Sequence, residues 1–129
     1  MPAKVCAKQV VYTPGPWSYQ EKSDTYTHIV RGPNNLFLTQ LSQDPSGVAE
    51  ANARLMASAP ELLESAKAAR KLIEREMNSA IECHSICEDG KPVDGTMDEL
   101  AAEAVAEMRG LLVIIDRAIT KAEGTHASP

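Results

Sequence analysis

The sequence predicts an α+β fold in which an antiparallel β-meander precedes helices. Before residue 42, short runs alternate apolar and polar residues between Pro, Gly and Asn, which is typical of strands and turns. After residue 47, apolar residues recur at three- and four-residue steps, which is typical of helices. Aromatic residues make up only 4% of the 129 residues, so we expect a core of small and aliphatic side chains in a single domain.

The meander is expected over residues 1–42, with three or four strands. Its clearest part is a hairpin of Tyr26–Arg31 and Leu36–Leu41. The segment Gly32-Pro33-Asn34-Asn35 between them favours a turn at every position, and its asparagines tolerate a positive φ. Further strands are expected earlier in the chain, at residues 8–12 and 17–20.

Strict alternation assigns the side chains of the second hairpin strand to two faces. Leu36 and Leu38 share one face, and Phe37, Thr39 and Leu41 share the other. The apolar face of the meander must be covered, and the helices downstream are the only candidates.

A short helix is expected over residues 48–57. Its apolar stripe is formed by Val48, Ala51, Leu55 and Met56, which recur at helical spacing.

The junction at residues 58–61 separates the short helix from a longer one. Ser58 and Glu61 have the spacing of a capping box, in which each side chain accepts a hydrogen bond from a free backbone amide of the new helix. Pro60 is tolerated in the first turn because its missing N–H would be unpaired there. A first helix therefore ends or kinks near Ser58 and a second begins.

Two long helices are expected over residues 59–87 and 96–123, followed by a loose tail at 124–129. A second capping box, Thr96-Met97-Asp98-Glu99, opens the last helix. The loop between them is short, so the helices are expected to pair antiparallel. The apolar stripe of the first helix is Leu62, Ala66, Ala69, Ile73, Met77 and Ala80. The stripe of the second is Leu100, Ala104, Met108, Leu111, Leu112, Ile115 and Ile119.

Composition and charge exclude several kinds of partner. A net charge of −5 without a cluster of Lys and Arg argues against a duplex nucleic-acid binder, which needs a basic face. No apolar run is long enough to cross a membrane, and no signal peptide is visible, so we expect a soluble cytosolic protein. A core with so few large side chains is often completed by a second copy, so a homo-oligomer is expected.

Chemical motifs are sparse. Cys83 and Cys87 would face the same side of a helix, but a structural zinc needs four ligands and no second pair of ligands is visible, so no metal is expected. The sequence lacks a nucleophile motif and a phosphate-binding glycine loop. We therefore expect neither enzymatic activity nor a cofactor.

Polar residues beside apolar elements are the best ligand-binding candidates. An arginine on an apolar helix can hold a phosphate or carboxylate bidentately, although it can equally extend along the helix to water. Asparagine in a helix usually makes a side-chain hydrogen bond. The candidates are Arg31, Asn34, Asn35, Asn52, Arg54, Arg109 and Trp17, the last of which can instead anchor the core of the sheet.

Two segments carry a resemblance. The segment ANARLMASAPELLES at 51–65 and the segment TPGPW at 13–17 resemble a large group of small phage and prophage proteins. The resemblance covers the layout of residues 13–66 and implies a phage origin, with the host-cell cytosol as the place of action. It implies no residue-by-residue activity.

The architecture is also similar to that of phage proteins that sequester cyclic-nucleotide or ADP-ribose immune signals as oligomers. This likeness implies counter-defence by binding a nucleotide signal in a pocket between subunits. The residues available to line such a pocket are Arg31, Asn34, Asn35, Arg54 and Arg109, with Trp17 or Phe37 for the base. The alternative is an interaction module that blocks a host protein through its helices or its acidic loop, Glu88 to Asp94. A phage protein of dispensable function is a third option.

Overall fold

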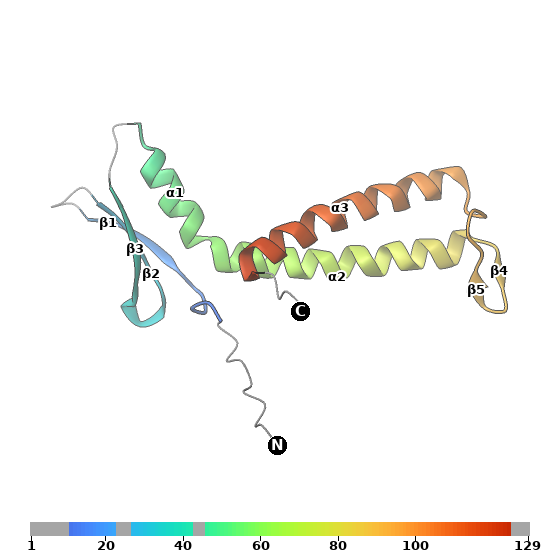
Figure 1. Ribbon diagram of the computed structural model, residues 1–129, viewed down its shortest axis with the longest axis horizontal. Helices are drawn as coiled ribbons and strands as arrows, with labels where there is room; N and C mark the ends of the chain where they lie inside the picture. Colours follow the sequence, from blue (N-terminus) through green and yellow to red (C-terminus); the bar gives the residue numbers. More distant parts are fainter. Residues whose placement is uncertain (1–10, 23–26, 43–45, 125–129) are drawn as a thin grey trace, which may run out of the picture. The chain divides into compact units, whose positions relative to one another are not determined.

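The computed structural model describes residues 11–22, 27–42 and 46–124, and it confirms the α+β fold class (Figure 1). Contacts divide the chain into two compact units, which we call the sheet unit (Met1–Glu61) and the helix unit (Leu62–Pro129). Each unit is described by itself, and the single domain expected from the chain length stays a prediction. The elements are β1 (Ser18–Lys22), β2 (Thr27–Arg31), a 3-10 turn (Pro33–Asn35), β3 (Phe37–Ser42), α1 (Val48–Ala57), α2 (Ala59–His84), β4 (Cys87–Glu88), β5 (Lys91–Pro92) and α3 (Glu99–Glu123).

The sheet unit contains three antiparallel strands in the order β1-β2-β3. The predicted hairpin is β2 and β3, and the predicted turn is a 3-10 turn in which Asn34 and Asn35 have φ of 55° and 62°. Residues 8–10 of the strand expected at 8–12 lie outside the described part of the chain. Its last two residues, Val11 and Tyr12, are not in a strand. The central strand β2 is buried on both faces, with Ile29 6% and Val30 1% exposed.

The assignment of β3 side chains to opposite faces was wrong. Leu38 and Leu41, which alternation places on opposite faces, both pack against the core formed by Val30, Ala53 and Ala57. The register shifts between Val30 and Arg31, so β3 gains one residue relative to β2 at that point. Such a bulge reverses the alternation on one side of it.

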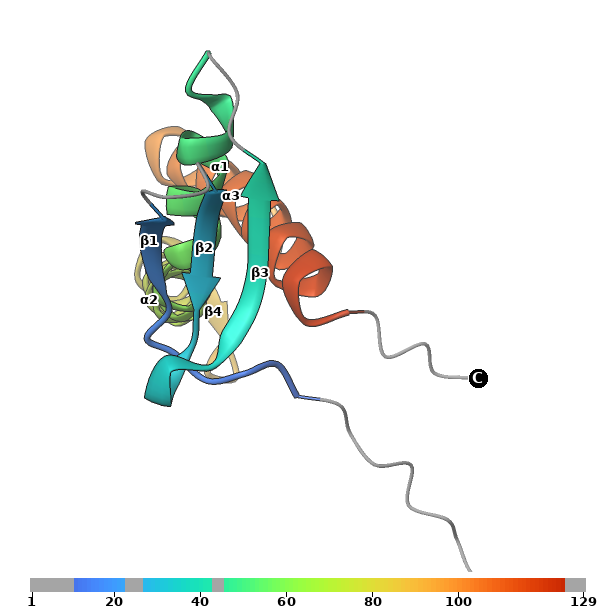
Figure 2. The same ribbon diagram turned by 90° about the vertical axis from the view of Figure 1, so that its left-hand side faces the viewer.

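Helix α1 covers the sheet and contacts all three strands (Figure 2). Its buried side is made of Ala49, Ala53 and Ala57, with Ala53 fully buried. The predicted stripe was therefore wrong: Val48, Leu55 and Met56 are 54%, 64% and 41% exposed, and Ala51 is also exposed. The strands supply the large side chains of Tyr19, Leu38 and Leu41 to this core, and Trp17 adds another just before β1. The helix can therefore approach closely only through alanines.

The helix junction is confirmed in position but not in detail. Helix α1 ends at Ala57 and α2 begins at Ala59, with Ser58 between them in a right-handed helical conformation. The Ser58 hydroxyl donates to the Arg54 carbonyl 2.9 Å away, so it closes α1 instead of capping α2. A Cβ at Gly15 would lie 2.9 Å from Pro60 Cβ, so the glycine allows this segment to pack against the start of α2.

The helix unit pairs α2 and α3 antiparallel, as predicted (Figure 1). Three contacts join the helices in antiparallel order: Lys67–Glu123 at 2.9 Å, Arg70–Asp116 at 2.6 Å and His84–Asp98 at 3.0 Å. Helix α2 ends at His84 and not at residue 87, and α3 begins at Glu99 and not at residue 96.

The start of α3 corrects the second capping box. Asp98 is the N-cap, and its Oδ1 accepts a hydrogen bond from Ala101 N at 3.0 Å. Thr96 instead bonds to the loop that precedes the helix. An aspartate in an extended conformation one residue before a helix competes well for the cap position, so the nearer cap prevails.

The apolar stripe predicted for α3 combines two sides of the helix. Val105 is buried. Half-buried apolar residues lie on the same side of the helix, at three- and four-residue steps: Ala101, Met108, Leu112, Ile115 and Ile119. Leu100, Ala104 and Leu111, which were predicted to belong to the same stripe, are exposed. The helix therefore has a buried side toward α2 and a second apolar side that faces outward.

Candidate functional site

The predicted acidic loop is folded into a small β-hairpin. Strands β4 and β5 pair antiparallel, with Cys87 opposite Pro92 and Glu88 opposite Lys91. The two turn residues, Asp89 and Gly90, have φ of 50° and 74°. A two-residue turn with positive φ at both positions matches the twist of a hairpin, and Asp-Gly is a favoured sequence for it. We call residues 86–94 the acidic hairpin.

Hydrogen bonds attach the acidic hairpin to its surroundings. Val93 N donates to Ile86 O at 2.8 Å, and Ile86 N donates to Thr96 Oγ1 at 2.9 Å. The Thr96 hydroxyl in turn donates to Val93 O at 2.7 Å. One threonine thus ties both ends of the hairpin together, which holds its backbone in one conformation.

The ends of α2 and α3 meet beside the acidic hairpin. His84 Nδ1 lies 3.0 Å from Asp98 Oδ2, a contact that is an ion pair when the imidazole is protonated. The hydrogen bond from Ala101 N is the largest effect on Asp98 and lowers its pKa below the ordinary value. Desolvation opposes this effect, and the hydrogen bond and charge of His84 lower the pKa further. Asp98 is therefore a stable anion that both caps α3 and contacts α2.

The surface of the acidic hairpin is both charged and apolar. Glu88, Asp89 and Asp94 are exposed, and none makes an ion pair with another described residue. Ile86 lies beside them with 64% of its surface exposed. Such a surface can contact a protein that carries basic side chains around an apolar spot.

The cysteines lie at the same end of the helix unit. Both Cys83 and Cys87 are exposed free thiols. Because α2 ends at His84, Cys87 belongs to β4, and the two thiols do not share a helix side as the sequence predicted. In the described residues, no group of three or more His, Cys, Asp or Glu is arranged to hold a metal ion.

Three predicted ligand-binding residues lie together at the turn after β2. Arg31 Nη1 donates to Asn35 O at 3.1 Å, and the Asn34 and Asn35 side chains are exposed. The Arg31 Nε is buried and has no hydrogen-bond partner among the described residues. This turn therefore holds a buried donor that a ligand could satisfy.

The other candidates of the sheet unit lie elsewhere in it. Arg54 contacts Glu50 Oε1 at 2.7 Å and lies 5.0 Å from the centre of the Tyr19 ring. Asn52 is exposed on α1, on the opposite flank from Arg54 about the buried alanines. Trp17 packs against the core, and its Nε1 donates to Thr13 O at 3.0 Å.

Arg109, the remaining candidate, belongs to the helix unit. It is exposed on α3, next to Gly110. The structure thus brings Arg31, Asn34 and Asn35 together in one turn, and it places the other candidates at separate positions.

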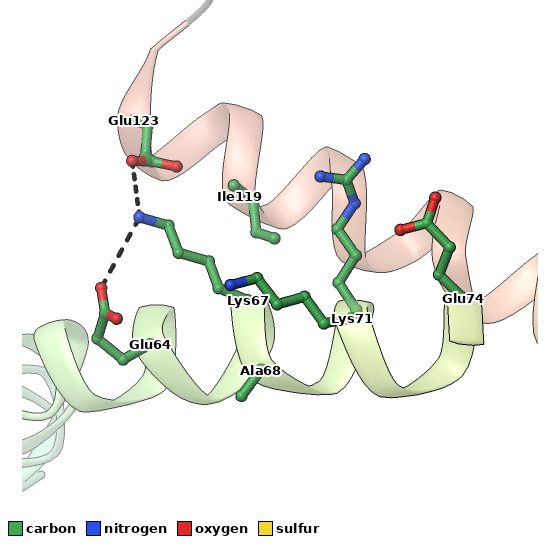
Figure 3. A pocket seen from close by; sticks show the side chains of 8 residues that line it. Glu64, Lys67, Ala68, Lys71, Glu74, Ile119 and Glu123 are labelled. Atoms are coloured by element: carbon green, nitrogen blue, oxygen red, sulfur yellow. Dashed lines mark hydrogen bonds and ion pairs between the residues drawn. The ribbon is translucent and has the colours of Figure 1, made fainter. Parts of the chain in front are cut away.

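The sequence reading missed a groove between α2 and α3, with a volume of about 410 Å³ (Figure 3). Lys67 lies between Glu64 and Glu123, at 3.7 and 2.9 Å. The charge of Lys67 is satisfied by these two carboxylates, so this lysine is a weak anchor for a free anion. The sequence shows these lysines and arginines outside any basic cluster, and nothing in their spacing reveals the opposing acids of α3. The lining residues are Glu64, Lys67, Ala68, Arg70, Lys71, Glu74, Ile119 and Glu123.

Comparison with known proteins gives a family. The family model described as Salmonella phage P22 protein Y8K6 matches residues 1–126. The chain belongs to this phage family. No curated protein and no solved structure matches it. The phage origin implied by the segments at 13–17 and 51–65 is therefore confirmed.

The two segments that carry the resemblance contact each other within the sheet unit of this phage protein. Gly15 packs against Pro60, and Trp17 packs against the core that contains Ala53 and Ala57. Residues that are distant in the sequence thus form one packed region of the sheet unit. Of the helices in the described part of the chain, none is long and apolar enough to cross a membrane.

Proposed function

We propose that this phage protein is a non-enzymatic accessory protein that counters a host defence by binding a host protein in the host cytosol. The acidic hairpin is the contact surface in this proposal. The observation that carries it is the folded β-hairpin with exposed carboxylates around the exposed Ile86.

The order of the acidic hairpin favours binding. A loop that is already held in one conformation loses little entropy when it binds, so more of the contact energy becomes affinity. Thr96 and the Asp-Gly turn supply this order. Of the functions considered, blocking a protein therefore has more structural support than sequestering a nucleotide.

Charge supports a basic partner. Carboxylates on the hairpin and a net charge of −5 would attract a basic groove and steer the encounter, most strongly at low salt. Ile86 would supply the apolar contact at the centre of the interface.

Affinity capture from host lysate, with reversed charges, tests the proposal. Glu88→Lys and Asp94→Lys should each reduce recovery of the specific partner at least tenfold, and raised salt should reduce recovery by the wild-type protein. Glu74→Lys is the matched control, because it changes the net charge equally at an exposed position on α2. Equal losses in all three variants, or a partner retained by Glu88→Lys, would remove the acidic hairpin from the proposal.

A second candidate function is sequestration of a nucleotide-derived immune signal at the turn after β2. It is favoured by the buried Arg31 Nε without a partner in the described residues, beside the exposed amides of Asn34 and Asn35. A phosphate could accept hydrogen bonds from this guanidinium.

Thermal unfolding against a panel of cyclic nucleotides and ADP-ribose derivatives tests this candidate. A ligand that binds only the folded protein stabilises it by about 2.7 kcal/mol at a hundredfold excess over its Kd. Arg31→Lys should abolish the shift while Arg109→Lys retains it. If no compound raises the midpoint, sequestration of these signals is excluded and the protein-binding function remains.

A further inference from the structure

The outward side of α3 is apolar without a partner in the described residues. Leu100, Leu111 and Ile114 follow one stripe at eleven- and three-residue spacing, and they are 80%, 49% and 64% exposed. The side of α3 that faces α2 is formed by different residues, so the helix has more apolar surface than the pair with α2 can bury. Contiguous exposed apolar side chains of this size mark an interaction surface.

Gly110 lies beside this stripe, in the middle of α3, about 40° around the helix from Ile114 and about 100° from Leu111. A glycine inside a helix weakens it, so a specific reason for it is expected. A Cβ placed at Gly110 would meet no described atom within 4 Å, so packing within the chain does not require the glycine. The absence of a side chain there allows another backbone to approach α3 closely.

Four charged residues of this side are placed symmetrically about Gly110, and a fifth, Glu107, has no basic counterpart. Glu99 and Glu103 precede it by eleven and seven residues, and Arg117 and Lys121 follow it by seven and eleven. Seven and eleven residues are close to two and three helical turns, so all four charges lie on the side of Gly110. All four are exposed, and none makes an ion pair with a described residue.

We propose that a second copy of this chain docks antiparallel on the outward side of α3, with a two-fold axis at Gly110. Rotation about this axis brings Glu103 of each copy beside Arg117 of the other, and Glu99 beside Lys121. Four opposite-charge pairs result, and the two glycines meet at the crossing. A two-fold interface uses the same patch on both copies, which this self-complementary pattern requires.

The pattern also selects the orientation. In a parallel pair, the acidic half of α3 would lie against the acidic half of the other copy, and the basic half against the basic half. Exposed ion pairs contribute little net affinity. The apolar side chains, chiefly Leu111 and Ile114, therefore provide the affinity, and the charges determine direction and register.

Reversed charges test this arrangement by sedimentation of the full chain. The wild-type protein should be a dimer, and Glu103→Arg and Arg117→Glu should each raise the dimer Kd at least tenfold. A one-to-one mixture of the two variants should form a heterodimer, because each copy then meets the opposite charge. The two residues lie fourteen positions apart on one helix, about 21 Å, so this rescue has to occur between copies.

A side chain at Gly110 tests the crossing separately. Gly110→Leu should raise helix content in circular dichroism and yet raise the dimer Kd at least tenfold, because the side chain separates the helices. Ala102→Leu, at an exposed position on another side of α3, is the matched control and should leave the Kd unchanged. A monomer at every concentration, no rescue in the mixture, or a dimer insensitive to Gly110→Leu would each overturn the proposal.

Discussion

The sheet unit and the helix unit draw on the same apolar residue types but bury them to different extents. In the sheet unit, His28, Ile29 and Val30 are at most 6% exposed. In the described part of the helix unit, Val105 and Leu63 are the buried hydrophobic residues, at 4% and 9%. A helix packed on a sheet buries the central strand, whereas two paired helices each bury one side and leave the other sides exposed.

The sheet unit buries its apolar side chains by itself, whereas the helix unit leaves apolar side chains that a partner can bury. The sheet unit completes its core with small residues on α1 and large ones on the strands. The helix unit leaves large side chains of α3 exposed, and a second copy can cover them. Substitutions in the two units should therefore affect different quantities.

The largest expected effect is in the sheet core. Ile29→Ala should lower the free energy of unfolding by about 2–5 kcal/mol, because Ile29 is 6% exposed and its loss leaves a cavity. Leu100→Ala, at 80% exposure, should change it by less than about 0.5 kcal/mol. Urea unfolding is followed by the fluorescence of Trp17, the single tryptophan, for the sheet unit and by circular dichroism for the helix unit. Equal losses in the two variants would contradict the comparison.

A smaller effect is expected where α1 meets the sheet. Ala53→Leu should cost about 1–3 kcal/mol, because Ala53 is 0% exposed and a larger side chain must displace α1. The same change at Ala51, which is exposed on the same helix, is the control and should be nearly neutral. The midpoint of thermal unfolding would show whether the alanine side is the packed side; a neutral Ala53→Leu would mean that it is not.

The smallest expected effect is a pH dependence of stability at the end of the helix unit where His84 contacts Asp98. The pKa of Asp98 is lower in the folded chain than in the unfolded one, so its stabilising contribution is complete above the ordinary carboxyl range, near pH 4. That contribution is lost as the pH falls through this range toward the lowered pKa. The midpoints of wild-type protein and Asp98→Ala, followed by circular dichroism, should therefore converge at low pH. A difference that stays constant down to pH 2 would contradict this assignment.

Local signals predicted much of the fold. The Gly-Pro-Asn-Asn turn, the break near Ser58 and the antiparallel helices follow from turn chemistry, spacing and a short loop. The bulge in β3, the alanine side of α1 and the Asp98 cap depend on competition between neighbours that one-dimensional patterns do not contain. A hydrophobic stripe on α1 identifies its large side chains. The space beneath α1 is already filled by large side chains of the sheet unit, so the buried side of α1 is made of alanines.

The candidate site was less predictable than the fold. The acidic loop was visible in composition, but its order depends on Thr96, which spacing had assigned to a helix cap. The two apolar sides of α3 were predicted as one stripe because the residues of both sides recur at three- and four-residue steps. Only the burial of Val105 and the exposure of Leu111 and Ile114 separate them.

The close approach of Gly15 to Pro60 has a consequence for inheritance. Gly15 and Trp17 of one segment pack against Pro60 and the core alanines of the other, so a change in either segment alters the space available to the other. Recombination between related phages that exchanged one segment alone would combine surfaces that had not adapted to each other. We therefore expect the two segments to be transmitted together, and a chain that carries only one of them to pack this region differently.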